Sequence, residues 1–398
     1  MVNFDYDVCV VGAGPVGSTI SYYLSLEGLS VVLLDKKTKI GYPLQCAGIL
    51  SNHINDVNEL PKDIILNKVK GAFIHSPNHI LTVEKDDDAA YIIDRIAYDQ
   101  FLLNRAIDNG VKLINKKAVD FDIDEGSVIL KNGEIIKSKI IVGCDGPNSV
   151  LSRYIGNTQD RFQASQLLVK ISPEDMMSYR GVSEYSMDFV DVCLLEETLP
   201  GFLWFIPIGN DLYRMGMFSN ESHKVQSEIL ADYLKKNNLK FEIIEKYKGF
   251  IPIFNKNNDM VKSRAVLIGD AAGHIKPTSG GGLLIAFNAC KWACEYILEA
   301  IEKDDLTILE KYPDKIMDEY QKEFSYQIKV QNALCMLTDD DIDYLFMKLK
   351  KNDGEKLISE YGDMDTQSLL IKESLKRGLV FKVMPSFLFK KIGKLFGF

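Results

Sequence analysis

The sequence lacks the features that mark secreted, membrane-spanning or nucleic-acid-binding proteins. Its seven cysteines form no C-x-x-C pair and have no histidine at metal-ligand spacing, which disfavours a disulfide framework and a metal site. No apolar stretch approaches the roughly 20 residues that span a bilayer, and the first residues carry no basic region or cleavage site of a signal peptide. Acidic residues outnumber basic ones by 56 to 47, so nucleic acid is not an expected partner. We expect a cytoplasmic protein with reduced thiols.

The chain does contain ample material for folded cores. With 398 residues and 46% hydrophobic content, it is longer than one simple core usually needs. We therefore expect two or three structural units.

The stretch from Asp7 to Asp35 is typical of a dinucleotide-binding unit. An apolar run leads into the turn Gly12-Ala13-Gly14-Pro15-Val16-Gly17, and a helix-like segment and a second apolar run follow. In such a turn Gly12 permits the tight bend, Gly14 lets backbone amides approach a pyrophosphate, and Gly17 lets helix and strand pack closely. Asp35, after the second run, is placed to accept hydrogen bonds from an adenosine ribose. The stretch predicts a bound dinucleotide.

Two later apolar runs also end in polar turns. One leads into Cys144-Asp145-Gly146, and the other into Gly269-Asp270-Ala271-Ala272-Gly273. On physical grounds alone, an acid at such a place is equally a helix cap or a turn residue. Gly280-Gly281-Gly282 then precedes a long helical segment, where it offers backbone amides to an anionic group or serves as a hinge.

Three segments together resemble the FAD-binding pattern of the flavin hydroxylase superfamily: the N-terminal glycine turn, Cys144-Asp145-Gly146 and Gly269-Asp270-Ala271-Ala272-Gly273. Three further motifs narrow the resemblance to the geranylgeranyl reductase family, and closest to its archaeal digeranylgeranylglycerophospholipid reductases: Pro43-Leu44-Gln45-Cys46-Ala47-Gly48, Phe202-Leu203-Trp204-Phe205-Ile206-Pro207 and Lys276-Pro277-Thr278-Ser279-Gly280-Gly281-Gly282. The similarity covers nearly the whole chain. It implies an α/β fold with a Rossmann-like FAD-binding domain, an inserted antiparallel-sheet substrate domain and a C-terminal helical region.

The pattern along the chain places these units. We expect a discontinuous FAD-binding domain from residues 1–67, 91–160 and 255–303. Polar and apolar residues alternate near residues 69–93, and residues 162–254 are strand-like with an amphipathic helix near Val225 to Lys236, which predicts a second sheet. Residues 68–90 and 161–254 would form this substrate-binding domain, and residues 304–398 the helical region.

The resemblance also implies a set of cofactor contacts. The residues expected to bind FAD are Gly12, Gly14, Gly17, Asp35, Cys46, Ala47, Ile49, Arg95, Ala118, Asp270, Gly281, Gly282 and Leu283. Two positions depart from the family's pattern, because Ala47 stands where relatives carry glycine and Ile206 stands where an aromatic usually precedes the proline. No metal ion is expected.

The implied activity is hydrogenation of isolated C=C bonds in geranylgeranyl chains of archaeal ether-lipid precursors, with hydride from N5 of reduced FAD. This chemistry needs a dry channel with a weak acid or an aromatic face beside the alkene. The candidate catalytic residues are Cys46 and Trp204, and the candidate substrate contacts are Phe202, Trp204 and Phe205. Cys46 would serve as proton donor, electrostatic tuner or redox-sensitive gate. Trp204 and Phe205 also fit ordinary core positions.

Two alternatives use the same scaffold. One is a flavin-dependent hydroxylase or epoxidase, and the other is a reductase of another prenylated substrate such as a quinone side chain. The chain carries one dinucleotide fingerprint, so either ferredoxin or NAD(P)H is open as the electron donor.

The C-terminal end carries a separate pattern. From Ser374 to Phe398 there are six basic residues and no acidic one, and several apolar residues share one helical arc, namely Leu388, Phe389, Ile392, Leu395 and Phe396. This pattern is typical of a helix on an anionic membrane, and a helix docked on the protein's own core is the alternative. We expect a peripheral location on the inner face of the cell membrane.

Overall fold

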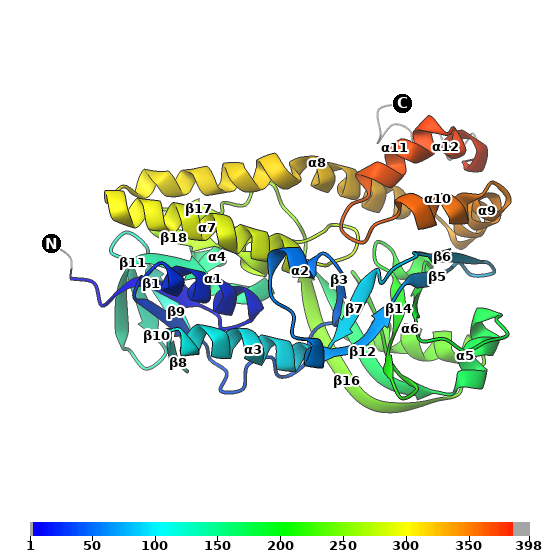
Figure 1. Cartoon of the computed structure of the whole chain (residues 1–398), viewed down its shortest axis with the longest axis horizontal. Helices are drawn as coiled ribbons and strands as arrows, with labels where there is room; N and C mark the ends of the chain where they lie inside the picture. Colours follow the sequence, from blue (N-terminus) through cyan, green and yellow to red (C-terminus); the bar gives the residue numbers. More distant parts are fainter. Residues whose placement is uncertain (1–2, 385–398) are drawn as a thin grey trace.

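The computed structural model describes residues 3–384 and shows two large sheets side by side, with helices across them (Figure 1). The first sheet has eight strands. Its main order is β17 (Val261–Lys262), β18 (Ala265–Leu267), β11 (Ile135–Gly143), β1 (Tyr6–Val11), β2 (Val31–Leu34) and β8 (Lys112–Ile114), with β9 (Ala118–Asp122) and β10 (Ser127–Leu130) joined through β11. From β18 to β8 the neighbouring strands run parallel, so their carboxyl ends lie at one edge.

The central strands are buried on both faces because their sequences are almost wholly aliphatic. The segment Val31-Val32-Leu33-Leu34 is at most 4% exposed at each residue. Three helices pack against one another beside this sheet: α1 (Pro15–Leu26), α3 (Arg95–Asp108) and α7 (Leu283–Lys303). The predicted strand, turn, helix and strand at the N-terminus are confirmed, as is the long helix from Leu283.

The second sheet has seven strands, and it is curved (Figure 1). Its order is β16 (Phe241–Pro252), β12 (Arg161–Ile171), β15 (Leu212–Ser219), β14 (Leu203–Gly209), β13 (Phe189–Cys193), β5 (Gly71–His75) and β6 (Ile80–Glu84). All pairs are antiparallel except β5 with β13, which are parallel. The exception arises because β5 comes from an earlier segment of the chain and needs no hairpin to β13.

Two helices pack with this sheet. The helix α6 (His223–Lys236) was expected from the sequence, whereas α5 (Pro173–Arg180) was not. Its signals are local and readable: Ser172 caps the first turn, Pro173 opens the helix, and Gly181 ends it in a left-handed conformation.

A small sheet of β3 (Ile49–Ser51), β7 (Ala90–Ile93) and β4 (Ile65–Val69) lies between the two large sheets (Figure 1). The short helix α2 (Ile54–Val57) follows β3 and packs on α7. The chain therefore crosses between the sheets several times, although the predicted domain boundaries stay a prediction.

The C-terminal helices are α8 (Lys311–Leu334), α9 (Asp339–Lys351), α10 (Gly354–Tyr361), α11 (Ser368–Lys376) and α12 (Leu379–Val383). The helix α8 runs beside α7 and carries the chain to the second sheet (Figure 1). There α10 covers the edge strand β6, since the backbone N–H of Thr82 donates to Glu355 at 2.7 Å and that of Glu84 donates to Ser359 at 3.1 Å. The edge is thereby closed to other strands.

Two further observations concern membranes. In residues 3–384, no helix is long and apolar enough to cross a bilayer. The amphipathic segment predicted over residues 388–396 lies outside the described residues.

A buried ion pair joins α5 to the parallel strand pair. The guanidinium of Arg180 donates to the carboxylate of Asp191 through Nε at 3.1 Å and Nη2 at 2.6 Å. His75 Nε2 lies 2.9 Å from the same carboxylate, and all three side chains are at most 4% exposed. Removing one member of such a group leaves an uncompensated charge in the interior.

The variant Asp191→Asn should therefore lower the free energy of unfolding by about 3–5 kcal/mol, because Arg180 then stays buried without its counter-ion. Urea denaturation measures this. Lys303→Gln, which breaks an exposed ion pair with Glu299, is the control and should leave the midpoint unchanged. Equal midpoints for both variants would show that the buried pair contributes no more to stability than the exposed pair.

Candidate functional site

The carboxyl ends of the parallel strands bring the N-terminal motif together. Gly12 follows β1 and donates its backbone N–H to Leu34 O of β2 at 2.7 Å. Asp35, the next residue after β2, accepts the backbone N–H of Ala13 at 2.8 Å and that of Lys37 at 2.8 Å. The acid and the glycine turn therefore form one hydrogen-bonded unit.

Close packing explains two glycines of this turn, and open space explains the third. A Cβ on Gly12 would lie 2.3 Å from Cys144 O, and one on Gly17 would lie 1.7 Å from Gly12 O. A Cβ on Gly14 would meet nothing within 4 Å. Gly14 thus faces open space at the start of α1, where backbone amides are available to a phosphate. This arrangement fits the pyrophosphate of a dinucleotide.

The later motifs lie at the same edge of the sheet. Asp145 follows β11, and Asp270 lies just after β18 in the turn Gly269–Ala272. A Cβ on Gly282 would lie 3.5 Å from Asp270 Oδ1, so the triple-glycine loop passes directly beside this acid. Burial raises the pKa of Asp270 to about 6, against the opposing effect of Arg95. A buried carboxylate beside a glycine loop is suited to accept hydrogen bonds from ligand hydroxyls.

Arg95 carries a permanent charge beside these groups. Burial disfavours that charge, but the Asp99 carboxylate offsets the cost of burial and raises the pKa of the Arg95 guanidinium. Its Nη2 donates to Asp99 Oδ1 at 3.0 Å. Arg95 is therefore held in place as a cation near both Cys46 and Asp270.

A second buried arginine holds the Cys46 loop and was not predicted from the sequence. Arg214 is 6% exposed, and its Nη1 donates to Ala47 O at 2.9 Å and to Ile93 O at 3.0 Å. A Cβ on Gly48 would lie 2.0 Å from this nitrogen, so only glycine fits there. The available signal was a single charge within the otherwise apolar strand Leu212–Ser219.

A cavity of about 1190 Å³ begins at the Cys46 loop and the triple-glycine loop. Its walls near these loops include Cys46, Ala47, Ile49, Phe202, Trp204, Ile206 and Gly281. Away from the loops it continues between the second sheet and the C-terminal helices, along Leu345, Leu349, Ile358, Leu370 and Val383. The lining is mostly apolar and the volume suits a long hydrocarbon.

Gln166 connects the tryptophan to the Cys46 loop. Trp204 Nε1 donates to Gln166 Oε1 at 3.3 Å, and Gln166 Nε2 donates to Cys46 O at 3.3 Å. The indole is thereby held with its polar atom satisfied. No sequence signal singles out Gln166, because its strand Arg161–Ile171 carries several other polar residues.

The structure does not bring every candidate together. Because side chains alternate along β14, Phe205 points away from Trp204 and is fully buried among Tyr179 and Tyr233 on the opposite face of the sheet. Ala118 opens β9 and is buried in the core of the first sheet. Leu283, by contrast, begins α7 directly after Gly282 and so lies at the end of the triple-glycine loop.

His274 serves the Asp270 turn from inside the protein. Its Nδ1 accepts the backbone N–H of Gly269 at 3.1 Å, and the ring is fully buried. Burial lowers the pKa of His274 to about 3. The imidazole is thus neutral at pH 7 and stabilises the turn.

This burial predicts an acid-sensitive stability term. Histidine in the unfolded chain titrates near pH 6.5, so the unfolded state binds more protons between pH 6.5 and 3. The contribution of the neutral ring is complete above pH 6.5 and is lost as the pH falls toward 3. His274→Asn retains an acceptor but cannot titrate, so its melting temperature should fall less between pH 6.5 and 4.

The raised pKa of Asp270 has the opposite effect on stability in part of this pH range, but the wild-type protein and His274→Asn share it. The difference between their curves therefore isolates His274. Parallel curves would contradict a neutral buried ring.

The chain is similar to known proteins over most of its length. The family model described as lycopene cyclase protein matches residues 7–362. An uncharacterized protein of Methanocaldococcus jannaschii is 31% identical over 397 residues, which cover 96% of this chain and 99% of the relative. Digeranylgeranylglycerophospholipid reductase 1 of Methanococcoides burtonii is 29% identical over 370 residues, covering 88% of this chain and 89% of that protein.

Solved structures show the same fold. A geranylgeranyl bacteriochlorophyll reductase-like protein from Thermoplasma acidophilum superposes with a TM-score of 0.82 at 22% identity, over 98% of this chain and 99% of that chain. A halogenase variant in complex with FAD has a TM-score of 0.64 at 16% identity, over 98% and 94% of the two chains. The predicted fold class and the resemblance to the geranylgeranyl reductase family are confirmed. The fold agrees with the predicted cofactor, FAD, since the halogenase variant with the same fold is in complex with FAD.

Proposed function

The chain belongs to the lycopene cyclase protein family, and we propose that it is an FAD-dependent reductase of geranylgeranyl chains in archaeal ether-lipid precursors. The observation that carries this proposal is the large, mostly apolar cavity lined both by the triple-glycine loop and by the C-terminal helices. Relatives named digeranylgeranylglycerophospholipid reductase, at 26–29% identity over most of the chain, support the same substrate class.

The candidate cofactor residues form two groups, and each group would hold one end of FAD. The turn of Gly12, Gly14 and Gly17 with Asp35 would hold the AMP and pyrophosphate end, because amides and a ribose acceptor meet there. The opposite end would lie at the cavity, held by Cys46, Ala47, Ile49, Arg95, Asp270, Gly281, Gly282 and Leu283. Ala118 would complete the set on the first sheet. When bound and reduced, FAD supplies the hydride.

The cavity walls would orient the alkene and exclude water. Trp204 and Phe202 present aromatic surface, and the ring face of a desolvated tryptophan stabilises developing positive charge by about 2 kcal/mol. The Cys46 thiol accepts the backbone N–H of Gly48 at 3.3 Å and lies at the cavity wall, so it is the candidate proton donor. We exclude Phe205 from this role because it faces the other side of β14.

The decisive experiment mixes anaerobically reduced holoprotein with lipid. A geranylgeranyl phospholipid should reoxidise the flavin and gain hydrogen, whereas its saturated analogue should not. Trp204→Leu should slow this reoxidation roughly 5- to 30-fold, the equivalent of about 1 to 2 kcal/mol. Trp292→Leu alters the other tryptophan of the chain, which packs near Tyr320 away from the cavity wall, and should change the rate little.

Two outcomes would reject the proposal. Reoxidation by the saturated analogue at an equal rate would exclude alkene reduction. Formation of an oxygenated lipid after admission of air, without anaerobic turnover, would favour a hydroxylase or epoxidase.

The same anaerobic assay compares ferredoxin and NAD(P)H as electron donors. A geranylgeranyl quinone in place of the phospholipid tests the other prenylated substrate class.

We further propose that the protein works at the inner face of the membrane, where such lipids reside. The described C-terminal helices support this: Leu369 is 50% exposed and Phe381 is 61% exposed, with Lys376 and Lys382 nearby in the chain. Cationic and apolar side chains together favour an anionic lipid surface.

Flotation with anionic vesicles measures this attachment. The full chain should float with the vesicles, and a chain ending at Val383 should float less, because it lacks the segment rich in lysine and phenylalanine. Neutral vesicles are the control. Equal flotation of both chains would remove the C-terminal segment from the membrane contact.

A further inference from the structure

A segment of the C-terminal region crosses directly over the triple-glycine loop. We call residues 362–367, between α10 and α11, the strap, and residues 276–282 the glycine loop. Both segments contribute to the cavity lining, through Gly362, Asp363, Met364, Thr366 and Gln367 of the strap and Lys276, Ser279, Gly280 and Gly281 of the loop. The far end of the chain thus reaches the place where the flavin is proposed to bind.

One ion pair joins the two segments. Lys276 Nζ lies 2.7 Å from Asp365 Oδ1, and the two side chains are only 12% and 17% exposed. The same ammonium donates to Met364 O at 2.9 Å. Asp365 Oδ2 accepts the hydroxyl of Ser51, at the end of β3, at 2.6 Å. Asp365 therefore ties the strap to both the glycine loop and the small sheet.

Lys276 also sets the shape of the glycine loop. Its backbone N–H donates to Gly281 O at 2.9 Å, and its carbonyl accepts the backbone N–H of Gly280 at 3.0 Å. A Cβ on Gly281 would lie 2.8 Å from Lys276 Cε, so the lysine side chain covers this glycine closely. The ammonium is consequently fixed beside the glycine-loop backbone, which lines the cavity where the flavin is proposed to lie.

The helix α8 supports the same junction. Gln327 Nε2 donates to Asp365 O at 3.2 Å, and the backbone N–H of Gln367 donates to Glu323 Oε1 at 2.5 Å. Gln367 Nε2 donates to Thr278 Oγ1 of the glycine loop at 2.7 Å. The strap is thus an ordered part of the site wall.

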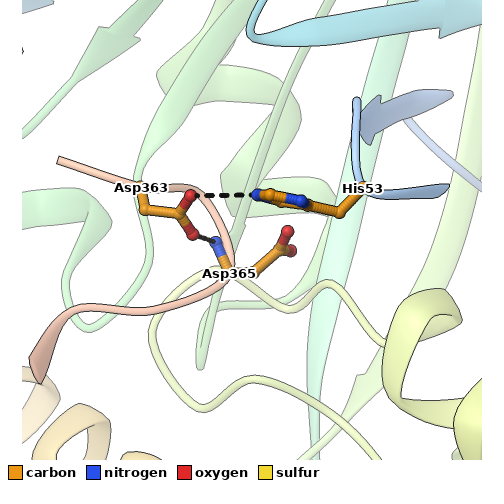
Figure 2. A group of neighbouring side chains, drawn as sticks. All are labelled: His53, Asp363 and Asp365. Carbon is orange, nitrogen blue, oxygen red and sulfur yellow. Dashed lines mark hydrogen bonds and ion pairs between the residues drawn. The ribbon is translucent and has the colours of Figure 1, made fainter. Parts of the chain in front are cut away.

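Asp363 stabilises the strap without touching Lys276. Figure 2 shows its carboxylate facing the ring of His53, at 3.5 Å, while its other oxygen accepts the backbone N–H of Asp365 at 2.7 Å. One ligand atom from each of His53, Asp363 and Asp365 lies within 4.8 Å of the other two, a spacing compatible with a metal ion. The Lys276 ammonium, however, already occupies Asp365, so we interpret the group as part of an ion-pair network.

We propose that Lys276 and Asp365 are positioning residues that hold the glycine loop against the flavin and set the positive charge beside it. This inference rests on the proposed function, which puts the flavin ring of FAD at the cavity beside the glycine loop. The reduced flavin ring carries negative charge, which a nearby ammonium stabilises and a nearby carboxylate opposes. Both residues therefore keep the glycine loop ordered, but they have opposite effects on the flavin's reduction potential: Lys276 raises it and Asp365 lowers it.

Two measurements test this pair. In the cofactor-free chain, Lys276→Gln and Asp365→Asn should both speed amide hydrogen exchange in residues 276–282, because each removes the ion pair. In the FAD-bound chain, Lys276→Gln should lower the midpoint potential of the flavin, and Asp365→Asn should raise it. A merely structural role would not give shifts of opposite sign.

Asp363→Asn is the matched control, since it makes the same change of charge in the same strap. Its side-chain oxygen still accepts the strap amides and the Lys276–Asp365 pair stays intact, so exchange in residues 276–282 should stay close to that of the wild-type protein. Lys276→Gln alone decides the sign of the charge effect if Asp365→Asn does not fold.

Unchanged exchange in the Lys276 and Asp365 variants, potential shifts of one sign, or equally fast exchange in Asp363→Asn would each overturn the proposal. The exchange measurement needs no ligand and the potential measurement needs only FAD, so neither needs prenyl lipid. A failure of lipid reduction therefore counts against the proposed function and leaves this test intact.

Discussion

The whole site depends on a very close approach between backbone segments at the N-terminal turn. Gly17 of α1 lies against Gly12, and Gly12 lies against the carbonyl of Cys144 after β11, with no room for a Cβ at either glycine. This contact brings the start of α1 and the ends of β1 and β11 to one point. The polar turns after the other parallel strands then meet at the same edge.

Buried cations organise the region between the two large sheets. Arg214, from the second sheet, binds carbonyl groups of Ala47 and Ile93, and Arg95, from α3, is paired with Asp99 beside Cys46. Backbone groups in this junction would otherwise lie buried without partners. The Cys46 loop is accordingly held from both sides, which places Trp204 and Gln166 beside it.

Local patterns were sufficient to predict much of this architecture. The glycine turn, the aliphatic strands and the helix after Gly282 follow from spacing within short windows, and the family resemblance supplied their assembly around FAD. The direction in which Phe205 points could not be inferred with the same ease, because it depends on which face of β14 meets the cavity. Arg214 and Asp365 escaped prediction because their partners are distant in the sequence: Ala47 is 167 residues from Arg214, and Lys276 is 89 residues from Asp365.

The covering of β6 by α10 has a consequence for how this kind of site changes during evolution. The end of the cavity remote from the glycine loop is built largely from α9 to α12, whereas the nucleotide turn belongs to the first sheet. Substitutions among Leu345, Leu349 and Leu370 can reshape that end while the contacts at Gly12 and Gly17 stay as they are. Under the proposed function, the C-terminal helices would therefore set the length of the hydrocarbon chain that the cavity accommodates.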